Sequence, residues 1–375
     1  MRKFLRSIAT LITITLALLQ VLVVVSIYIN PVHFYLFAFM GYLFPVVWIA
    51  NILSFIYWAL KRKKRALIPL LTIVIGWTQW QNTFQWSGKT VDDISTLSKP
   101  LTIMTLNVKM FDYYQWSGRE DLQEKIFDYI RKKNPDIVCL QEFYSTNQKR
   151  EFTKNYIIAR LNNYTYRHIG YIQKKSSGRG FGLATFSKYP ITGRQVLKFE
   201  NSTNFSIQTD IKVKGVTVRL FNNHLESMRL SSQDISVIGN MKSVDGFEDE
   251  KGIKLVANKI GRAFKERAQQ AQMIGKHIEN SAYPVIVCGD FNDTPVSYVY
   301  HKMRGNLKDA FVEAGKGFCG TYNGKLPSFR IDYILFDPKF EAYNFERDKL
   351  NLSDHFPIIT TIDIDAGSND GVKTK

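Results

Sequence analysis

The sequence contains few cysteines, and charged residues are missing from a long stretch near its start. Only three of the 375 residues are cysteine, and Cys139 and Cys288 lie inside apolar runs. A free thiol in such a run packs as a small hydrophobic side chain. The sequence therefore excludes a protein held together by a framework of disulfides.

Between Arg6 and Lys61 there is no Asp, Glu, Lys or Arg, a stretch of 54 residues interrupted by "INPVHF" at 29–34. Two membrane spans of about 20 residues each fit into it. Residues 66–88 are also uncharged, with three tryptophans towards their end, and predict a third span. A cleaved signal peptide is disfavoured because "VVVSIYINPV" lacks a small-x-small cleavage site. Residues 1–86 are thus predicted to be a membrane region of about three helices.

Basic residues flank these spans unevenly, which predicts an orientation. They occur at 2–6 and in "KRKKR" at 61–65, whereas the loop at 30–33 carries only His33. Basic flanks stay in the cytoplasm, so both basic ends should be cytoplasmic. With three spans, everything after Trp86 lies outside the cytoplasm; with two, it lies inside. We expect a multi-pass inner-membrane protein whose remaining chain faces the extracytoplasmic side.

After a polar linker at 87–99, the pattern changes to short β-rich runs that alternate with amphipathic helices. We predict helices at 119–134 and 253–280, and a loop or insertion at 227–252. Strands are predicted at 101–108, 136–142, 181–187, 216–225, 285–290, 330–336 and 357–364. This α/β pattern defines a second domain at 100–365, and the tail 366–375 is predicted to be disordered.

Polar side chains that suit a hard cation and a phosphate follow several of these apolar runs. They are Asn107, Glu142, His224, Asp290, Asn292, Asp332, Asp354 and His355. Magnesium takes oxygen ligands, so one or two carboxylates with an amide suffice to bind it. A hydrolase of phosphate esters also needs a group that orients water and donors that stabilise negative charge. Each residue alone fits a turn, a cap or a structural histidine, and it is their joint occurrence that favours a site.

The order "TLNV", "LQE", "FGLATFSKYPI", "NNHLES", "GDFND", "RIDYIL", "SDHFPI" resembles the endonuclease/exonuclease/phosphatase superfamily, which is DNase I-like. The resemblance covers about residues 100 to 365. It implies a four-layer α/β/β/α sandwich with the site at one edge, here preceded by the transmembrane helical region. It also implies Glu142 as the principal magnesium ligand, with Asn107 and Asp354 near the metal and Mn²⁺ as an alternative ion.

The resemblance further implies that Asp290 aligns or deprotonates the attacking water, and that Asn292 holds the water or the phosphate. His355 would contact the phosphate, oriented by Asp332, while His224 would stabilise the transition state. If "RID" and "SDH" lie on neighbouring strands, the Asp332 carboxylate can accept a hydrogen bond from His355.

The substrate stays open, because one fold can carry many phosphoesterase activities. Residues 100–375 hold 40 Lys and Arg against 31 Asp and Glu, which modestly favours a nuclease. The membrane anchor instead favours a phospholipid or sphingomyelin-type phosphodiesterase. A phosphatase of soluble phosphates and an inactive tethered binding module are the remaining alternatives.

Overall fold

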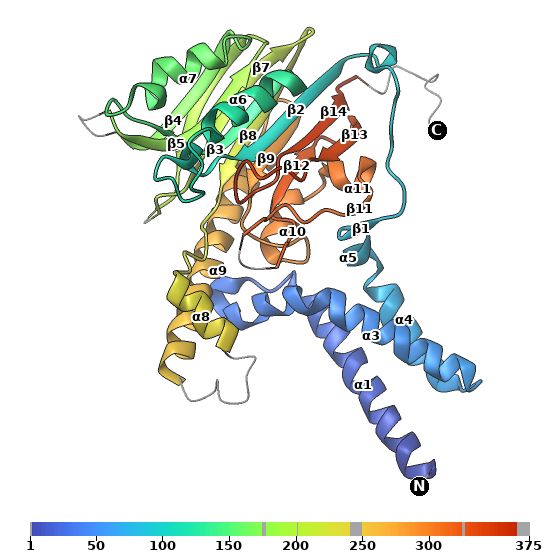
Figure 1. The fold of residues 1–375 in the computed structure, drawn as a ribbon. Helices are drawn as coiled ribbons and strands as arrows, with labels where there is room; N and C mark the ends of the chain where they lie inside the picture. The colour runs from blue at the N-terminus through green and yellow to red at the C-terminus, as the bar shows by residue number, and fades with distance from the viewer. Residues whose placement is uncertain (1, 175–177, 201, 241–249, 325–326, 366–375) are drawn as a thin grey trace. The chain divides into compact units, whose positions relative to one another are not determined.

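In this computed structural model, helices form most of residues 2–81, and strands are frequent in the later chain (Figure 1). The structure describes residues 2–174, 178–200, 202–240, 250–324 and 327–365. The chain divides into two compact units. The first comprises Met1–Phe84, Met228–Gln272 and Asp293–Met303, and the second comprises Gln85–Ser227, Met273–Asn292 and Arg304–Lys375.

The second unit contains two six-stranded mixed sheets. The first sheet has the order β13-β14-β2-β3-β5-β4, with β2 Pro100–Asn107, β3 Ile137–Ser145, β4 Tyr166–Lys174, β5 Gly180–Ser187, β13 Glu341–Arg347 and β14 Ile358–Asp363. The second has the order β10-β12-β9-β8-β7-β6, with β6 Ile191–Lys198, β7 Phe205–Val213, β8 Val216–His224, β9 Val285–Asp290, β10 Lys308–Asp309 and β12 Asp332–Phe336. The predicted α/β class with a DNase I-like pair of sheets is therefore confirmed.

Each sheet contains one parallel pair, and each parallel pair brings predicted site residues to a common edge. The β2–β3 pair places Asn107 opposite Gln141, and the β8–β9 pair places His224 opposite Asp290. Parallel strands need a long crossover, which is supplied by a segment containing α6 (Leu122–Lys133) in the first sheet. Polar residues at the carboxyl ends of these strands are therefore neighbours across the ladders.

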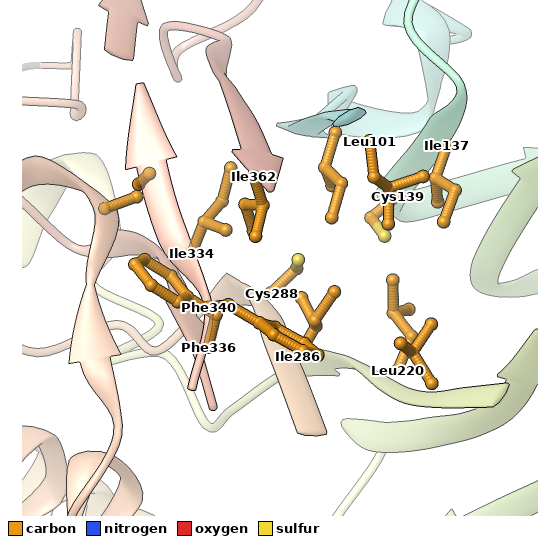
Figure 2. Close-up of a cluster of buried hydrophobic side chains, with 14 of the residues drawn as sticks. Leu101, Ile137, Cys139, Leu220, Ile286, Cys288, Ile334, Phe336, Phe340 and Ile362 are labelled. Atoms are coloured by element: carbon orange, nitrogen blue, oxygen red, sulfur yellow. The ribbon is translucent and has the colours of Figure 1, made fainter. Parts of the chain in front are cut away.

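Apolar side chains from the two sheets fill the space between them (Figure 2). Leu101 and Ile137 of the first sheet lie in one buried cluster with Leu220, Ile286 and Ile334 of the second. Cys139 and Cys288 belong to the same cluster and are free and buried, as predicted. Cys319 is also free and buried. The period-two alternation of the strands thus builds one core between two sheets.

Helices cover the outer face of the first sheet. On α6, Ile126, Phe127 and Ile130 belong to a buried cluster with Val138 and Phe186 of that sheet, and α7 (Lys154–Arg160) adds Ile157. This face and the two sheets account for three of the four predicted layers, and the fourth stays a prediction. Helix α6 ends where Asn134 adopts a left-handed backbone, a common helix stop.

Strands β4, β6, β7 and β13 were not predicted. Three of them are sheet edges, and β6 exposes most of its residues, so its apolar signal is weak. The stretch 227–252, predicted as a loop or insertion, contains the helix α8 (Ser232–Asn240). The tail 366–375, predicted as disordered, lies outside the described residues. Short elements complete the unit: β11 (Gly317–Phe318) and α11 (Ala310–Ala314).

The first unit begins with α1 (Arg2–Ser26), α2 (Pro31–Phe34) and α3 (Met40–Leu60). They are followed by α4 (Leu67–Ile75), α5 (Trp77–Gln81) and β1 (Phe84–Gln85), and α1, α3 and α4 pack against one another. Two stretches, Lys3–Ser26 and Pro31–Leu60, are long and apolar enough to cross a membrane. The predicted third span is not one long helix, because it breaks at Gly76 into pieces of nine and five residues.

The later segments of this unit are also helical. They comprise α8, the amino-terminal part of α9 (Glu250–Glu279) and most of α10 (Tyr298–Arg304). The helix predicted at 253–280 is confirmed by α9. Val296 joins a buried apolar cluster with Val23, Phe44, Trp48 and Trp80, so this segment shares a core with the N-terminal helices.

Candidate functional site

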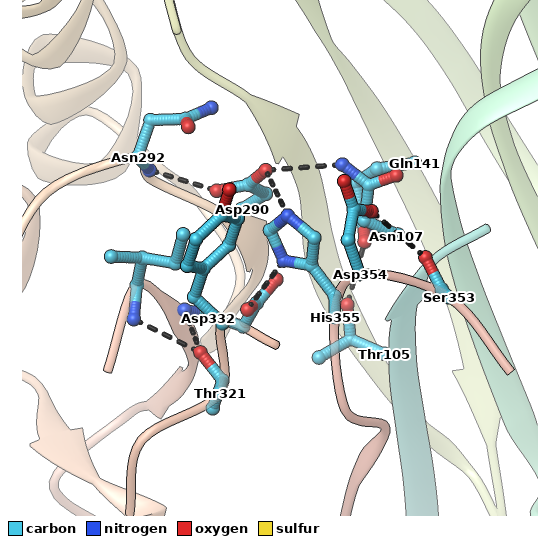
Figure 3. Close-up of polar contacts among 12 residues, drawn as sticks. Thr105, Asn107, Gln141, Asp290, Asn292, Thr321, Asp332, Ser353, Asp354 and His355 are labelled. Atoms are coloured by element: carbon cyan, nitrogen blue, oxygen red, sulfur yellow. Dashed lines mark hydrogen bonds and ion pairs between the residues drawn. The ribbon is translucent and has the colours of Figure 1, made fainter. Parts of the chain in front are cut away.

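A cluster of buried acids and histidines lies in the second unit where strands of both sheets end (Figure 3). Asp290, Asp332 and His355 offer ligand-type atoms that all lie within 4.8 Å of one another. Asp290 is the last residue of β9 and Asp332 the first of β12, and these two residues are paired in the sheet. His355 precedes β14 of the other sheet. The site thus forms where the two sheets meet.

The predicted contact between Asp332 and His355 is present, although its expected geometry is wrong. The Nδ1 atom of His355 lies 2.9 Å from Oδ2 of Asp332. The two residues are not on neighbouring strands, since β12 and β14 belong to different sheets. The sequence pattern gave the chemistry of the pair correctly, but the contact spans the gap between the sheets.

Asp290 lies at the centre of the cluster. Its Oδ2 atom lies 3.7 Å from Nε2 of both His224 and His355, and it accepts a hydrogen bond of 3.1 Å from Nδ2 of Asn107. Its other oxygen accepts the backbone N–H of Asn292 at 2.8 Å. Asp290 therefore faces two imidazoles and is fixed on both oxygens.

Asn292 lies beside this carboxylate in a strained turn. Its φ is +53°, a left-handed value that costs a non-glycine residue free energy unless its surroundings fix it. Its side chain donates to the carbonyl of Leu225 at 2.9 Å. The turn therefore holds the backbone N–H of Asn292 against Asp290. The side-chain amide of Asn292 is bound to the loop that follows β8.

Glu142 does not end its strand, as predicted from the sequence, because β3 continues to Ser145. It lies instead at an irregularity of the β3–β5 ladder, between Leu140 and Phe143, with a φ of +49°. A bulge of this kind re-aims a side chain. Here Oε1 of Glu142 accepts a hydrogen bond of 3.2 Å from Asn107 and lies 3.9 Å from Nε2 of His224.

Asp354 carries a contact that the sequence did not predict. Its Oδ2 atom lies 2.8 Å from the Nζ atom of Lys109, and its Oδ1 atom accepts a hydrogen bond from Ser353. Lys109 follows Asn107 by two residues, in a run of four left-handed residues from Lys109 to Asp112. That backbone has no local sequence signal, so only the spacing from Asn107 could have suggested Lys109.

Gln141 is a second residue that the sequence reasoning missed. Its amide donates to Thr105 at 3.0 Å and to Asn222 of the other sheet at 2.7 Å, while Asn222 donates to the carbonyl of Ala184. These buried amides link the two sheets just beneath the site, and Oε1 of Gln141 is buried there without a hydrogen-bond partner. The signal available in the sequence was the position of Gln141 and Asn222 inside apolar strands.

Burial changes the proton affinity of the acids. Burial raises the pKa of Asp290 to about 6, with Asp332 adding to the shift and the two histidines opposing it. Burial also raises the pKa of Glu142, against the hydrogen bond from Asn107. A carboxylate that titrates near neutral pH is suited to accept a proton.

For His355, neighbouring charges outweigh the effect of burial on the pKa. Burial disfavours its charged ring, but the carboxylates of Asp332 and Asp290 outweigh that effect and raise the pKa of His355 to about 10. For Asp354, burial is outweighed by His355 and Lys109, so its pKa is lowered. The site therefore holds an imidazolium between carboxylates at neutral pH.

The donor set fits a hard divalent cation. Glu142 and Asp354 offer carboxylate oxygens, and Oδ1 of Asp332 is buried without a hydrogen-bond partner. Oδ1 of Asn107 accepts the backbone N–H of Lys109 at 3.0 Å and keeps a second lone pair for a metal. A magnesium centre on Asp290, Asp332 and His355, whose ligand-type atoms also lie together, fits less well, because one ligand would be an imidazole nitrogen and Mg²⁺ prefers oxygen. The oxygen-rich side around Glu142 is the better match.

Comparison with known proteins assigns the chain to a family. The Endonuclease/Exonuclease/phosphatase family matches residues 104–355, so the chain belongs to that family of phosphoesterases. Residues 3–83 match a second family, described as a domain of unknown function. No protein of curated function is detectably similar in sequence.

Solved structures share the fold of the second part of the chain. An endonuclease/exonuclease/phosphatase from Beutenbergia cavernae superposes with a TM-score of 0.52 at 18% identity, covering 71% of this chain and 72% of that chain. Humanized D. rerio TDP2 with 14 mutations superposes with a TM-score of 0.51 at 19% identity, covering 71% and 99%. At this identity the likeness concerns the fold alone.

Proposed function

We propose that the protein is a membrane-anchored, magnesium-dependent hydrolase of phosphate esters that acts on phosphodiester bonds. The observation that carries this proposal is the setting of Asp290. Its carboxylate has a pKa of about 6 and faces two imidazoles, one of which is held charged by Asp332. The attack of a water molecule on a phosphate requires a proton acceptor and charged donors of this kind.

In the proposed reaction Asp290 accepts a proton from a water molecule as that water attacks phosphorus. The backbone N–H of Asn292 keeps Asp290 aligned. His355 donates from Nε2 to a phosphate oxygen, since Asp332 occupies its Nδ1 atom. His224 stabilises the charge that develops as the bond between phosphorus and the leaving oxygen breaks, and no covalent intermediate forms.

Magnesium would be held by Glu142, Asn107 and Asp354, with Mn²⁺ as an alternative ion. It would polarise the phosphate and neutralise developing charge. Lys109 pairs with Asp354 at 2.8 Å and adds a second positive charge at this end of the site. The hydrogen bond from Asn107 orients Glu142 at its bulge.

Nucleic acid is the favoured substrate class, which would make the protein a nuclease. Residues 100–375 carry nine more basic than acidic residues, and a polyanion binds such a surface through its phosphates. The family description names endonucleases, exonucleases and phosphatases. A phospholipid phosphodiesterase is the second candidate, and the apolar N-terminal helices are the observation that favours it, because they would hold the enzyme at a lipid surface.

The membrane anchor is itself part of the proposal. Large apolar side chains of α1 and α3 are exposed, among them Leu18 at 61% and Val46 at 70%, as expected for helices that face lipid and not for core helices. Polar contacts lie between the helices: Asn51 donates to the carbonyl of Leu16, and Thr72 donates to Asn51. Such interhelical hydrogen bonds are typical of membrane bundles.

The test is hydrolysis by the full chain in detergent micelles, with magnesium and one representative each of single-stranded DNA, RNA, sphingomyelin and a soluble phosphomonoester. We expect nucleic acid to be cleaved. Glu142→Gln should lower this activity by about a hundredfold or more, because a metal-binding charge is lost. Calorimetric titration with Mg²⁺ should show weaker binding to the variant.

Glu120→Gln is the matched control, since Glu120 is exposed and should change neither quantity. Full activity in Glu142→Gln would remove Glu142 from the metal site. Cleavage of sphingomyelin alone would establish the second candidate. If no substrate is hydrolysed with Mg²⁺ or Mn²⁺, the remaining alternative is the inactive tethered binding module.

A further inference from the structure

The loop that follows β2 carries aromatic side chains that the proposed reaction does not use. Two of them are exposed to solvent, Tyr114 by 56% and Trp116 by 53%. Their ring centres lie 5.1 Å apart, so the two rings form one surface, called the aromatic platform below. The whole loop belongs to the second unit, which also contains the candidate site. Single exposed apolar side chains are common, whereas two large rings in contact call for an explanation.

The inner part of this loop is fixed in one conformation. Residues 109–112 form the run of left-handed backbone described above, and within it Phe111 is buried against Phe127 of α6. The buried carboxylate of Asp112 accepts hydrogen bonds from the backbone N–H and the hydroxyl group of Ser117. A strained backbone of this kind persists only where its surroundings determine it. The loop therefore holds its exposed rings on a fixed base.

The loop is also tied to the segment that carries Asp354. Near its start, Nζ of Lys109 lies 2.8 Å from Oδ2 of Asp354. Near its end, Nη1 of Arg119 donates a hydrogen bond of 2.7 Å to the carbonyl of Asn351. The same Nζ atom of Lys109 lies 5.6 Å from the ring centre of Trp116. The aromatic platform therefore begins one side chain away from the candidate site.

The row of rings continues beyond the platform and is flanked by cations. The ring centres of Tyr113 and Tyr114 lie 5.0 Å apart, and Nζ of Lys149 lies 5.0 Å from the ring centre of Tyr113. The hydroxyl group of Tyr113 and the guanidinium of Arg179 both donate to Oε1 of Gln148. Lys149 and Arg179 are exposed. Rings and cations thus lie side by side along one surface of the second unit.

This combination matches the chemistry of a single strand of nucleic acid. Unpaired bases of any identity stack on aromatic side chains, while Lys and Arg bind the phosphates between them. In a double helix the faces of the bases are covered by their neighbours, so they are closed to such contacts. A membrane interface also accepts Tyr and Trp. The direct connection through Lys109 to Asp354 favours the substrate strand, because it joins the rings to the place where a phosphate would be cleaved.

We propose that Tyr114 and Trp116 stack on bases of a single-stranded nucleic acid whose scissile phosphate lies at the candidate site. Lys109 lies between the platform and the site, and Lys149 and Arg179 bind phosphates further along the strand. This inference rests on the proposed function, since it names the form of nucleic acid that the enzyme takes. The rings do not reach the reacting atoms, so they contribute to binding of the strand and not to the rate of the chemical step.

Binding is measured without hydrolysis, by fluorescence anisotropy of labelled single-stranded DNA with the full chain in detergent micelles and EDTA. Trp116→Leu keeps an apolar side chain but removes the aromatic face, and we expect it to weaken binding about tenfold. Trp116→Phe should keep most of the affinity. Tyr283→Leu is the matched control, because Tyr283 is exposed and precedes β9 at the end away from Asp290, and it should bind like the native protein.

A strand of the same length without bases separates stacking from charge. Native protein and Trp116→Leu should bind this abasic strand equally, because nothing is left to stack on the ring. Lys149→Gln should weaken both strands alike and reduce the salt dependence of binding by about one phosphate contact. In turnover of base-carrying DNA with Mg²⁺, Trp116→Leu should raise KM about tenfold and leave kcat nearly unchanged.

Three results would overturn the inference: no binding of single-stranded DNA by the native protein, native affinity in Trp116→Leu, or the same loss for the abasic strand as for the base-carrying one. Native affinity for DNA together with a raised KM for sphingomyelin in mixed micelles would make the rings a lipid contact instead. None of these results would touch the hydrolysis of phosphate esters, which is tested separately by Glu142→Gln.

Discussion

At the scale of single residues, His355 is the group whose chemistry depends most on its neighbours. One ring nitrogen contacts Asp332 at 2.9 Å, and the other lies 3.7 Å from Asp290. The first contact fixes the ring, and the second places its other nitrogen beside the Asp290 carboxylate. In the proposed reaction this nitrogen donates to a phosphate oxygen. Asp332 therefore acts through His355, and removing the two together should differ from removing two independent residues.

A double-mutant cycle on kcat tests this coupling. His355→Ala should lower kcat more than Asp332→Asn, because the latter leaves the imidazole present but less well oriented. The combined variant should cost little more than His355→Ala alone, since residues that act as a unit are not additive. Thermal unfolding of each variant, measured alongside, separates loss of turnover from loss of fold. Fully additive effects on kcat would contradict the coupling.

Some features of single residues could be predicted from sequence and others could not. Five of the eight candidate residues follow an apolar run, whereas Asp332, Asp354 and His355 precede one, and the structure gathers all eight in one unit. The backbone at Glu142 was not predictable, because its φ of +49° is imposed by pairing with a strand about 40 residues later in the sequence. Lys109 was missed because the left-handed run that it begins has no local sequence signal.

At the scale of elements, the two sheets are joined by polar contacts as well as by the apolar core. Besides Gln141 and Asn222, the edge strand β4 contributes His168, whose Nδ1 atom lies 2.8 Å from Oγ1 of Thr209 on β7. His168 is almost fully buried. Burial, aided by the charge of Arg194, lowers its pKa from 6.5 to about 4. The folded protein therefore keeps this ring neutral where the unfolded chain protonates it.

This difference predicts a loss of stability in acid. Above pH 6.5 the ring is neutral in both states and has no effect, and between pH 6.5 and about 4 the unfolded state binds the proton first. The free energy of unfolding should fall over this range by up to about 3 kcal/mol. His168→Asn, which keeps a polar atom towards Thr209 but does not titrate, should lose less stability as the pH falls.

Urea unfolding of the full chain at pH 7 and pH 4.5, followed by intrinsic fluorescence, measures the effect. His277→Asn is the control, because that histidine is only half-buried, and it should behave like the native protein. If native protein and His168→Asn respond identically to acid, then His168 is already charged in the folded state.

The elements themselves were predicted unevenly, for a physical reason. Central strands such as β9 are buried at every position and give continuous apolar runs. Edge strands such as β6 bury few residues, so their sequence resembles a loop. Helix α6 was found because its apolar positions recur at helical spacing against one sheet.

At the scale of the whole molecule, the sequence predicted an N-terminal helical region but not which later segments of the chain belong to the same unit. The first unit takes in Met228–Gln272 and Asp293–Met303 along with the first 84 residues. No local pattern reveals this, because it depends on contacts between segments about 200 residues apart. The boundary predicted at 87–99 stays a prediction, and an isolated segment from residue 95 would lack the N-terminal residues that pack on Val296.

For the proposed membrane-anchored enzyme, the side of the membrane on which the site lies depends on the third apolar stretch. The break at Gly76 leaves α4 and α5 each shorter than the roughly 20 residues that a span requires. The helical residues from Lys64 to Gln81 nevertheless reach about 27 Å at 1.5 Å per residue, close to the roughly 30 Å of a bilayer core. Helix α4 also packs against both α1 and α3. We therefore expect three crossings, with a kink at Gly76.

A reporter enzyme that folds only outside the cytoplasm tests this arrangement. Fused after residue 95 of the chain it should be active, and fused after Arg62, within the basic segment at 61–65, it should be inactive. A fusion after Asn30 should be active, since the loop between the first two spans lacks Lys and Arg. An inactive fusion after residue 95, alongside an active one after Asn30, would mean two crossings. The site would then face the nucleic acids and soluble phosphates of the cell interior, which would strengthen the nuclease proposal and weaken the case for an extracytoplasmic lipid substrate.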